Sequence, residues 1–487
     1  MSRLTRYILW ILIIVGYLSG DSSSVAGIKG GGKGDESGTQ PNIFKVRREK
    51  LIKEIEPASI AVFYSSPLRY RNNDTEYRYR QGDNFYYLTG INEPNCIMVL
   101  IPGGYNITSQ SDTVSSQTIK ELLFYQSHSG RDAIFEGPGL TEDILKTRYG
   151  MENVFPISDF GRMIGSLIAK AEVLYVPTFP NDFTSDIAEY TRPLRNLLPS
   201  INQKVVVKDP TPILTEMRAI KSPEEIALIR KAVEITVVAQ TQAIMSIEPG
   251  MYEYEVQALI EYIFTRMSAE SFAFPSIVGS GENAHILHPM QNRRLMNDGE
   301  MVVIDAGAEY HGYAADVTRT VPVNGHFSDS QKEIYEIVLN AEEETIRSIK
   351  PGMPIQGFEK KAVEIITRGL VQLGILQGNV DSLIAAGAYH KYTVHGMGHP
   401  VGLSVHDVEP KSGRFEAGMV VTVEPGIYIN QGIPGVDPKY YNISVRIEDT
   451  ILVTKDGAEN LSAGVSRNIQ EIERLMKKRG MGNEPLD

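Results

Sequence analysis

The feature that most constrains the fold is a degenerate internal repeat in the second half of the chain. Residues 234–251 begin with Glu-Ile and end with Ser-Ile-Glu-Pro-Gly-Met, and residues 336–353 repeat this with one Lys for Glu, at an offset of 102 (234 to 336). A β-branched run then leads from a glycine to a carboxylate six residues later, once at Asp305 and once at Glu424. A Pro-Gly-Met string alone could be coincidence in a helix-ending turn, but the aligned strands argue against that. Two helix-plus-strand units predict a pseudo-twofold domain with both carboxylates near the junction of its halves.

The first of these strands predicts a β-hairpin that carries two aspartates. The apolar run ends at Asp305, the chain reverses near Gly312, and a second strand leaves through Asp316. If the turn centres on residues 310–311, the two aspartates are direct cross-strand partners about 5 Å apart. An aspartate at a strand end commonly caps a turn, but two carboxylates this close repel each other. A bound metal ion is therefore the interpretation that we favour.

Three more residues of ligand type follow. His399 lies in the glycine-rich segment 395–407, Glu424 ends a strand, and Glu448 lies in another strand. Four carboxylates and one histidine suit a pair of divalent ions that prefer oxygen, Mn²⁺ before Zn²⁺. The spacing of His395 and His399 is that of a helical zinc site. However, the glycines between them and the proline after them disfavour a helix, and the expected glutamate is absent.

Short patterns predict the local elements and the start of the second domain. Ser222, Pro223 and Glu225 form a helix start with a capping box. The patterns predict helices at 44–55 and 159–171 and strands at 58–64, 85–88, 96–101 and 173–176.

The order Asp305, Asp316, His399, Glu424 and Glu448 resembles the pita-bread metallopeptidases, which include aminopeptidase P, prolidase and methionine aminopeptidase. The surrounding strings are most similar to aminopeptidase P: 277–283 (IVGSGEN), 286–288 (ILH), 303–307 (VIDAG), 316–320 (DVTRT), 422–426 (TVEPG) and 446–449 (RIED). Each string alone is weak evidence, but together they are specific.

The resemblance extends over roughly residues 42–475 and implies an α/β chain of two domains. An aminopeptidase P N-terminal α/β domain would cover 43–215, and a pseudo-twofold pita-bread catalytic domain would cover 216–480. The string at 79–94 (YRQGDNFYYLTGINEP) resembles the N-terminal domain of aminopeptidase P, which methionine aminopeptidases lack.

The resemblance also implies the roles of the ligands. Asp305 would chelate one metal ion, Asp316 and Glu448 would bridge two ions, and His399 and Glu424 would bind the second ion.

Five residues are implied to act on the substrate or on the ligands. His288 and His406 would contact the scissile carbonyl or the tetrahedral intermediate, and His395 would help to form a proline pocket. Glu424 is a candidate proton shuttle. Arg446 would orient a carboxylate ligand, unless it forms a plain ion pair. Isolated histidines are commonly structural, so these roles rest on the resemblance.

The activity implied is that of an Xaa-Pro aminopeptidase, acting on peptides with a free N-terminus and proline in second position. A prolidase, restricted to Xaa-Pro dipeptides, is one alternative, and a metal-free peptide-binding protein is another. Pro289 and Pro400 stand where family members often carry aromatic residues, which leaves the substrate preference open. We also expect a homo-oligomer.

Composition excludes some classes of partner and site. The net charge of −12 argues against nucleic acid and anionic membranes as partners. The single cysteine, Cys96, leaves no intrachain disulfide and no cysteine-based metal site.

The first residues form a targeting segment. Arg3 and Arg6 precede an uncharged run over residues 7–18, which is short for a membrane span and suits a signal peptide. We predict a signal peptide at 1–26, a flexible linker at 27–42 and export to the periplasm or the outside of the cell. A mitochondrial presequence is the alternative, and the membrane would be a partner only if the segment stays uncleaved.

Overall fold

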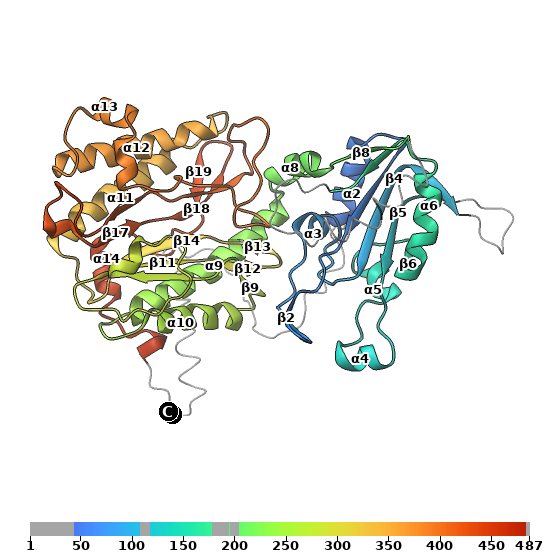
Figure 1. Ribbon diagram of the computed structural model, residues 1–487, viewed down its shortest axis with the longest axis horizontal. Coiled ribbons are helices and arrows are strands. Elements are labelled where there is room, and N and C mark those ends of the chain that lie inside the picture. The colour runs from blue at the N-terminus through green and yellow to red at the C-terminus, as the bar shows by residue number, and fades with distance from the viewer. Residues whose placement is uncertain (1–42, 108–116, 178–193, 195–203, 484–487) are drawn as a thin grey trace, which may run out of the picture. The chain divides into compact units, whose positions relative to one another are not determined.

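The computed structural model describes residues 43–107, 117–177, 194 and 204–483 (Figure 1). The predicted signal peptide and linker lie outside the described residues. Within the described ranges, no helix is both long and apolar enough to cross a membrane.

A mixed six-stranded sheet forms the centre of the N-terminal domain. Its strand order is β6-β5-β4-β1-β7-β8, with β1 Ser59–Tyr64, β4 Cys96–Ile107, β5 Gln117–Tyr125, β6 Val154–Pro156, β7 Val173–Tyr175 and β8 Val206–Lys208. Ile60 and Val62 of β1 join the apolar cluster of α6 (Phe160–Ile168). Ala61 and Phe63 join the cluster that contains Leu51 of α2 (Ile43–Glu54). Because successive side chains of a strand point to opposite faces, both faces of this sheet are covered.

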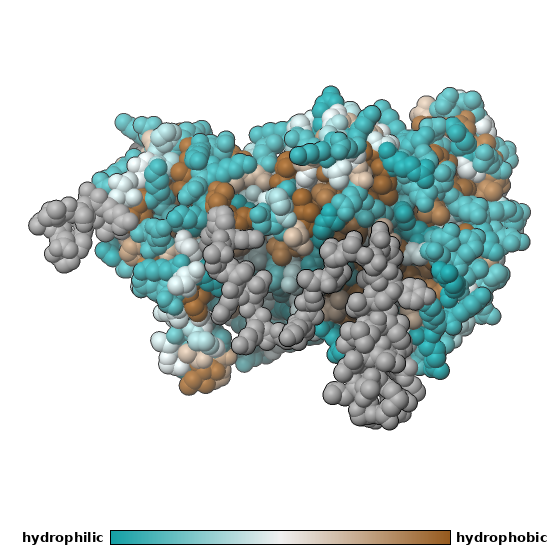
Figure 2. Space-filling view, turned by 180° about the vertical axis from the view of Figure 1, so that it is seen from behind, coloured by the Kyte–Doolittle hydropathy of each residue, from teal (hydrophilic) through white to brown (hydrophobic). Residues whose placement is uncertain are grey.

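Smaller elements complete the N-terminal domain: β2 Tyr70–Asn72, β3 Thr75–Glu76, α3 Asp83–Thr89, α4 Arg131–Phe135, α5 Glu142–Thr147, η1 Ile157–Asp159 and α8 Thr211–Ala219. The face in Figure 2 is largely hydrophilic, with an apolar tip at lower left, where α4 exposes two large side chains. These are Ile134 and Phe135, which are 83% and 73% exposed.

The strand predicted at 85–88 is wrong, because these residues belong to helix α3. Asp83 lies in the first turn, and Gly90 ends the helix at φ 71° with its N–H donating to the carbonyl of Tyr86. Thr89 Oγ1 donates to the carbonyl of Phe85 at 2.8 Å, one helical turn back. A run of three aromatic residues and a leucine suits a strand or a buried helix, and the flanking Asp and Gly were the signals that decide between them. The other predicted helices and strands of this domain are confirmed, with ends shifted by a few residues.

The catalytic domain repeats one unit twice, as the sequence predicts. The first copy contains α9 (Pro223–Ser246), α10 (Glu253–Arg266) and β11 (Met301–Ala306), and the second contains α11 (Asp329–Ser348), α12 (Ile355–Gln372) and β15 (Val420–Val423). Helix α9 begins with the predicted capping box.

The Pro-Gly turns of the two copies adopt the same conformation. Gly250 has φ 95° and Gly352 has φ 85°. The N–H of Gly250 donates to the carbonyl of Met296 at 2.9 Å, and that of Gly352 donates to Phe415 at 2.8 Å. The repeat is therefore structural and not a coincidence of sequence.

Short sheets carry the site between the two similar halves. They are β10-β11-β14, β13-β12-β9, β15-β18-β19 and β16-β17, with β9 Ser271–Phe272, β10 Ile277–Ser280, β12 Ala308–Tyr310, β13 Tyr313–Ala314, β14 Val317–Pro322, β16 Gly426–Ile429, β17 Ile443–Arg446, β18 Asp449–Val453 and β19 Ala458–Asn460. The remaining elements are η2 Gly281–His285, α13 Val380–Ala385, η3 Ala388–Lys391, η4 Pro438–Tyr440, α14 Ile469–Leu475 and η5 Met481–Asn483.

The direct pairing of the two aspartates is wrong by two residues. The turn falls on His311 (φ 48°) and Gly312 (φ 77°), so Tyr310 pairs with Tyr313. Asp305 is therefore opposite Thr318, and Asp316 lies two positions before Thr318 on the second strand. A two-residue turn of this type needs positive φ at both central positions, which histidine followed by glycine tolerates better than tyrosine followed by histidine. The aspartates are diagonal neighbours, a separation of about 7–8 Å for the backbone in a regular pair.

Gly307 makes this hairpin possible. A Cβ at this position would overlap the carbonyl oxygen of Ala315 and approach the ring of Phe274 to 3.0 Å. We expect Gly307→Ala to lower the free energy of unfolding of the catalytic domain by about 1–3 kcal/mol, because the backbone must shift to relieve the overlap. Gly357→Ala is the matched control, since its Cβ would meet only ordinary contacts at 3.7 and 4.0 Å. Urea unfolding followed by circular dichroism measures both, and equal midpoints for the two variants would contradict the interpretation.

Candidate metal centre

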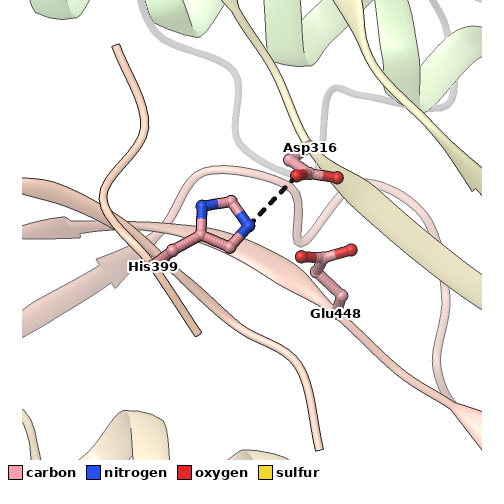
Figure 3. Close-up of side chains that lie close together, drawn as sticks. All are labelled: Asp316, His399 and Glu448. Atoms are coloured by element: carbon pink, nitrogen blue, oxygen red, sulfur yellow. Dashed lines mark ion pairs between the residues drawn. The ribbon is translucent and has the colours of Figure 1, made fainter. Parts of the chain in front are cut away.

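Three of the predicted ligands converge in the catalytic domain. Asp316 directly precedes β14, Glu448 lies between β17 and β18, and His399 lies in the loop before β15. Each offers one ligand atom, and these atoms lie within 4.8 Å of one another (Figure 3). The Nε2 atom of His399 is 3.5 Å from Oδ2 of Asp316. Residues that are 132 positions apart in the chain (316 and 448) thus face one small volume.

The other two predicted ligands border the same volume. Oε1 of Glu424 is 3.6 Å from Nε2 of His399. Asp305 is buried and raises the pKa values of Asp316 and Glu448 by its negative charge. Oδ1 of Asp305 and Oδ1 of Asp316 are buried and make no hydrogen bond to any described residue. Buried acceptors without donors are costly, so these two oxygens fit metal ligands.

Backbone pairing fixes the positions of the ligands. Thr318 and Glu448 exchange backbone hydrogen bonds of 3.3 and 3.1 Å, and Oγ1 of Thr318 donates to Oε2 of Glu448 at 2.7 Å. The N–H of His399 donates to Oγ1 of Thr422 at 3.0 Å, and the N–H of Thr422 donates to the carbonyl of His399 at 2.8 Å. Strands from the two halves therefore hold the centre between them.

Electrostatics favours a cation at this centre. Burial, followed by the charges of Glu448 and Asp305, raises the pKa of Asp316 well above its usual value. Burial and the charge of Glu448 raise the pKa of Glu424 well above its usual value. Burial and the charge of Asp305 raise the pKa of Glu448 to about 7. Divalent cations would remove this repulsion, and the oxygen-rich donor set fits them.

The imidazole of His399 is oriented for coordination. Its Nδ1 lies 3.0 Å from the carbonyl oxygen of Pro400, which can only accept a hydrogen bond. Nδ1 therefore carries the proton, and Nε2 presents its lone pair to the carboxylates. A hydrogen bond from the second ring nitrogen to a carbonyl is the usual support of a histidine ligand.

Arg446 binds Oδ2 of Asp305, and Oδ1 is the oxygen that has no donor among the described residues. This buried arginine donates to Oδ2 of Asp305 at 2.7 Å, to the hydroxyl of Tyr428 at 2.9 Å and to Oγ1 of Thr318 at 3.3 Å. It therefore forms an ion pair with Asp305 and also fixes the orientation of this predicted ligand. Burial alone would lower its pKa, but Tyr428 and Asp305 raise it well above the usual value.

His395 is connected to Arg446 through the hydroxyl of Tyr428. Nδ1 of His395 lies 2.6 Å from the carbonyl oxygen of Gly396, so it donates there, and Nε2 lies 2.8 Å from the hydroxyl of Tyr428. Burial and the positive charge of Arg446 lower the pKa of His395 to about 4. The ring is therefore neutral near pH 7 and accepts a hydrogen bond from Tyr428.

His406 and His288 lie at the rim. The ring of His406 contacts that of His399 edge to face, with 4.2 Å between centroids. Burial and the charges of His399 and His288 lower the pKa of His406. His288 is exposed, and its charge also lowers the pKa of His395. The predicted histidines thus share one neighbourhood, and no helix joins His395 to His399.

Comparisons with known proteins agree with this geometry. The sequence profile of metallopeptidase family M24 matches residues 227–455, and that of the aminopeptidase P N-terminal domain matches residues 44–175. The chain is 39% identical to Xaa-Pro aminopeptidase of Escherichia coli over 89% of its own length and 97% of that protein. It is 29% identical to Xaa-Pro aminopeptidase 3 of Homo sapiens, over 89% of this chain and 85% of that one.

Solved structures give the same result. Aminopeptidase P of E. coli with the inhibitor Pro-Leu matches with a TM-score of 0.81 and 39% identity, over 89% of this chain and 98% of that chain. Aminopeptidase PepP of Pseudomonas aeruginosa matches with a TM-score of 0.81 and 36% identity, over 89% and 97%. The chain belongs to the aminopeptidase P group of metallopeptidase family M24.

Membership of this group makes the chain a metalloenzyme of divalent ions. Two residues of its centre were not found from the sequence. Tyr428 connects Arg446 to His395, and Thr318 connects Asp305 to Glu448 across the sheet. The alternation of β16 after Glu424 was the available signal for Tyr428. The signal for Thr318 was the hairpin register, which was predicted incorrectly.

Metal binding to this M24 centre should depend on pH. Burial and mutual repulsion raise the pKa values of Asp316 and Glu424 and raise that of Glu448 to about 7, so these carboxyls hold protons more readily than usual in the metal-free protein. A cation must displace these protons, so its apparent affinity should increase from pH 5.5 to 7.5. We expect Mn²⁺ to raise the melting temperature more at pH 7.5 than at pH 5.5.

Glu333→Gln is the control, because it removes a partly exposed carboxylate that pairs with Lys439. This variant should keep the pH dependence. Calorimetry in buffers of different protonation enthalpy should also record proton release on binding. A Mn²⁺ shift that is equal at both pH values would contradict the charge assignment.

Proposed function

We propose that the chain is an Xaa-Pro aminopeptidase, a metal-dependent hydrolase that releases the first residue of peptides with proline in second position. The observation that carries the proposal is the convergence of Asp316, His399 and Glu448, with Asp305 and Glu424 beside them, in a chain of the aminopeptidase P group. Relatives that the chain matches over nearly their whole length carry this activity in their names.

Two divalent ions at this centre would polarise the scissile carbonyl and activate a water molecule. Asp305, Asp316, His399, Glu424 and Glu448 would hold them. We propose Mn²⁺ as the resident metal, since four of the five donors are carboxylates.

The chain's own residues supply orientation and proton handling. Arg446 fixes one oxygen of Asp305, so that the other oxygen faces the centre. Glu424 is the candidate proton shuttle, with Oε2 at 3.5 Å from Nδ1 of His395. His288 and His406 are proposed to hold the substrate carbonyl, since both lie at the rim. The neutral ring of His395 suits a pocket for an apolar proline ring.

We also propose that residues 1–26 direct export and that the chain acts as a homo-oligomer. Support for export comes from Arg3 and Arg6 before an uncharged apolar run. A mitochondrial presequence remains the alternative for the same segment.

The first test is metal dependence. Chelation should abolish peptide hydrolysis, and Mn²⁺ should restore it more fully than Zn²⁺. His399→Ala should lose bound metal and activity by at least about 100-fold, because it removes the nitrogen donor. His326→Ala is the matched control, since this histidine is 72% exposed and pairs with Glu473. Full activity in metal-stripped protein, checked by elemental analysis, would overturn the proposal.

The second test is the requirement for proline. A peptide bond before proline has no N–H, and the ring fixes φ near −65°. Rates should therefore be high for Xaa-Pro-Xaa, and at least about 100-fold lower for Xaa-Ala-Xaa and for N-acetylated Xaa-Pro-Xaa. Mass spectrometry of the products gives these rates. Cleavage of Xaa-Pro dipeptides alone would indicate a prolidase, and equal rates with proline and alanine would remove the proline-specific assignment.

A further inference from the structure

The loop that carries His406, residues 400–407, is held at its two ends by backbone hydrogen bonds within the catalytic domain. The N–H of Val401 donates to the carbonyl of Val420 at 2.9 Å, that of Ala314 to Gly402 at 2.8 Å, and that of Asp407 to Pro400 at 2.9 Å. The exposed side chain of His406 makes no hydrogen bond to the residues that the structure describes, and its ring contacts that of His399. The position of the His406 ring is therefore set by its backbone.

A buried carboxylate beside His406 holds the end of the loop. Asp407 has a side chain that is only 1% exposed, and it pairs with Nη2 of Arg218 at 2.6 Å and with Nζ of Lys221 at 3.0 Å. A Cβ at position 402 would overlap this carboxylate, so glycine is needed where the loop closes over Asp407. Arg218 lies in α8 and Lys221 in the linker that follows, so both partners precede the catalytic helices.

The N-terminal domain holds the middle of the same loop. Nη2 of Arg80 donates to the carbonyl of Leu403 at 2.6 Å, and Nε of Arg80 pairs with Glu309 at 2.6 Å. Asp83 accepts from the hydroxyl of Ser404, from Nη1 of Arg80 at 2.9 Å and from Nη2 of Arg218 at 3.0 Å.

The charges of this cluster support one another. Burial would raise the pKa of Asp83, but Arg218 and Arg80 lower it below its usual value. Arg218 bridges Asp83 and Asp407, so the contacts in the middle and at the end of the loop form one network. Removal of either carboxylate would leave the buried guanidinium of Arg218 with one carboxylate partner in place of two.

We propose that Arg80 and Asp83 of the N-terminal domain are positioning residues that set the place of His406 over the metal centre. Their contacts to Leu403, Ser404 and Arg218 fix the loop from outside the catalytic domain. The inference deepens the proposed function, because it assigns the string at 79–94 a role in the hydrolysis itself. Neither residue is proposed to touch the substrate or the metal.

The experiment compares Arg80→Ala with Arg230→Ala in the full-length, Mn²⁺-loaded protein. Both arginines bridge elements through carboxylates and are similarly exposed, 46% for Arg80 and 44% for Arg230, which pairs with Glu459 on the surface. On an Xaa-Pro-Xaa peptide, Arg80→Ala should lower kcat about 10–100-fold with a small change in KM, the range for a misplaced catalytic group. Arg230→Ala should leave both constants unchanged.

Two further measurements separate positioning from a general loss of structure. In a His406→Ala background, Arg80→Ala should cause no further loss of kcat, whereas in a His288→Ala background its effect should persist. Arg80→Lys should recover part of kcat, since it keeps the charge and one donor. Effects that simply add in the His406→Ala background would overturn the proposal.

Hydrogen exchange gives a readout that does not depend on activity. Amides of residues 403–407 should exchange faster in Arg80→Ala and Asp83→Asn than in the wild type and in Arg230→Ala. If the wild type cleaves no Xaa-Pro peptide, the proposed function fails, while this exchange pattern still tests whether Arg80 and Asp83 hold the loop. Unchanged exchange in both variants overturns the positioning role of Arg80 and Asp83 even in an active enzyme.

Discussion

The repulsion among four carboxylates buried in one small volume is the constraint on which the rest of the catalytic domain depends. Asp305, Asp316, Glu424 and Glu448 come from both halves of the repeat, and their mutual charges and burial raise the pKa of three of them. Without a cation or protons this arrangement opposes folding, because an unpaired buried charge is expensive. The pseudo-twofold fold brings together groups that repel each other. A bound metal ion relieves this repulsion, and the relief adds to the free energy of metal binding.

Two buried arginines supply positive charge next to the carboxylates of the centre. Arg446 donates to one oxygen of Asp305. Arg319 is fully buried and donates to the carbonyls of Thr318 and Glu448 and to Oδ1 of Asp449. Five donors in a fixed plane allow one side chain to bind several acceptors in set directions, which the three rotatable donors of a lysine would not fix. Ligand geometry is thus set by the backbone that Arg319 holds as much as by the ligands themselves.

The sequence predicted what is periodic or repeated, and it failed where the result depends on distant contacts. The repeat predicted the two halves and the strands that end at Asp305 and Glu424. Register within the hairpin was predicted incorrectly, since one choice of turn residue shifts the pairing by two. The run at 85–88 folds as a helix, which Asp83 in its first turn and Gly90 at its end indicate locally.

The same contrast between local patterns and distant contacts applies to the candidate site. All the predicted ligand positions lie around one volume, because the motifs that carry them are local strings. Tyr428 and Thr318 act through hydrogen-bond partners more than 15 residues away in the chain, and the local signals for them are only strand alternation and hairpin register (Tyr428 lies 18 positions before Arg446). Asp407 follows a predicted histidine, yet its partners Arg218 and Lys221 belong to a segment without any catalytic motif. Such ion pairs are visible only once the chain is folded.

Pro400 supports the metal centre through its backbone. At position 400, the carbonyl oxygen accepts from Nδ1 of His399 and from the N–H of Asp407. Both contacts use the backbone of Pro400, so they do not need the aromatic side chain that relatives often carry there. The tautomer of His399 and the closure of the loop therefore do not depend on the side chain at position 400. Differences in peptide preference within this group can arise at such positions without any change in the chemistry of the ligands.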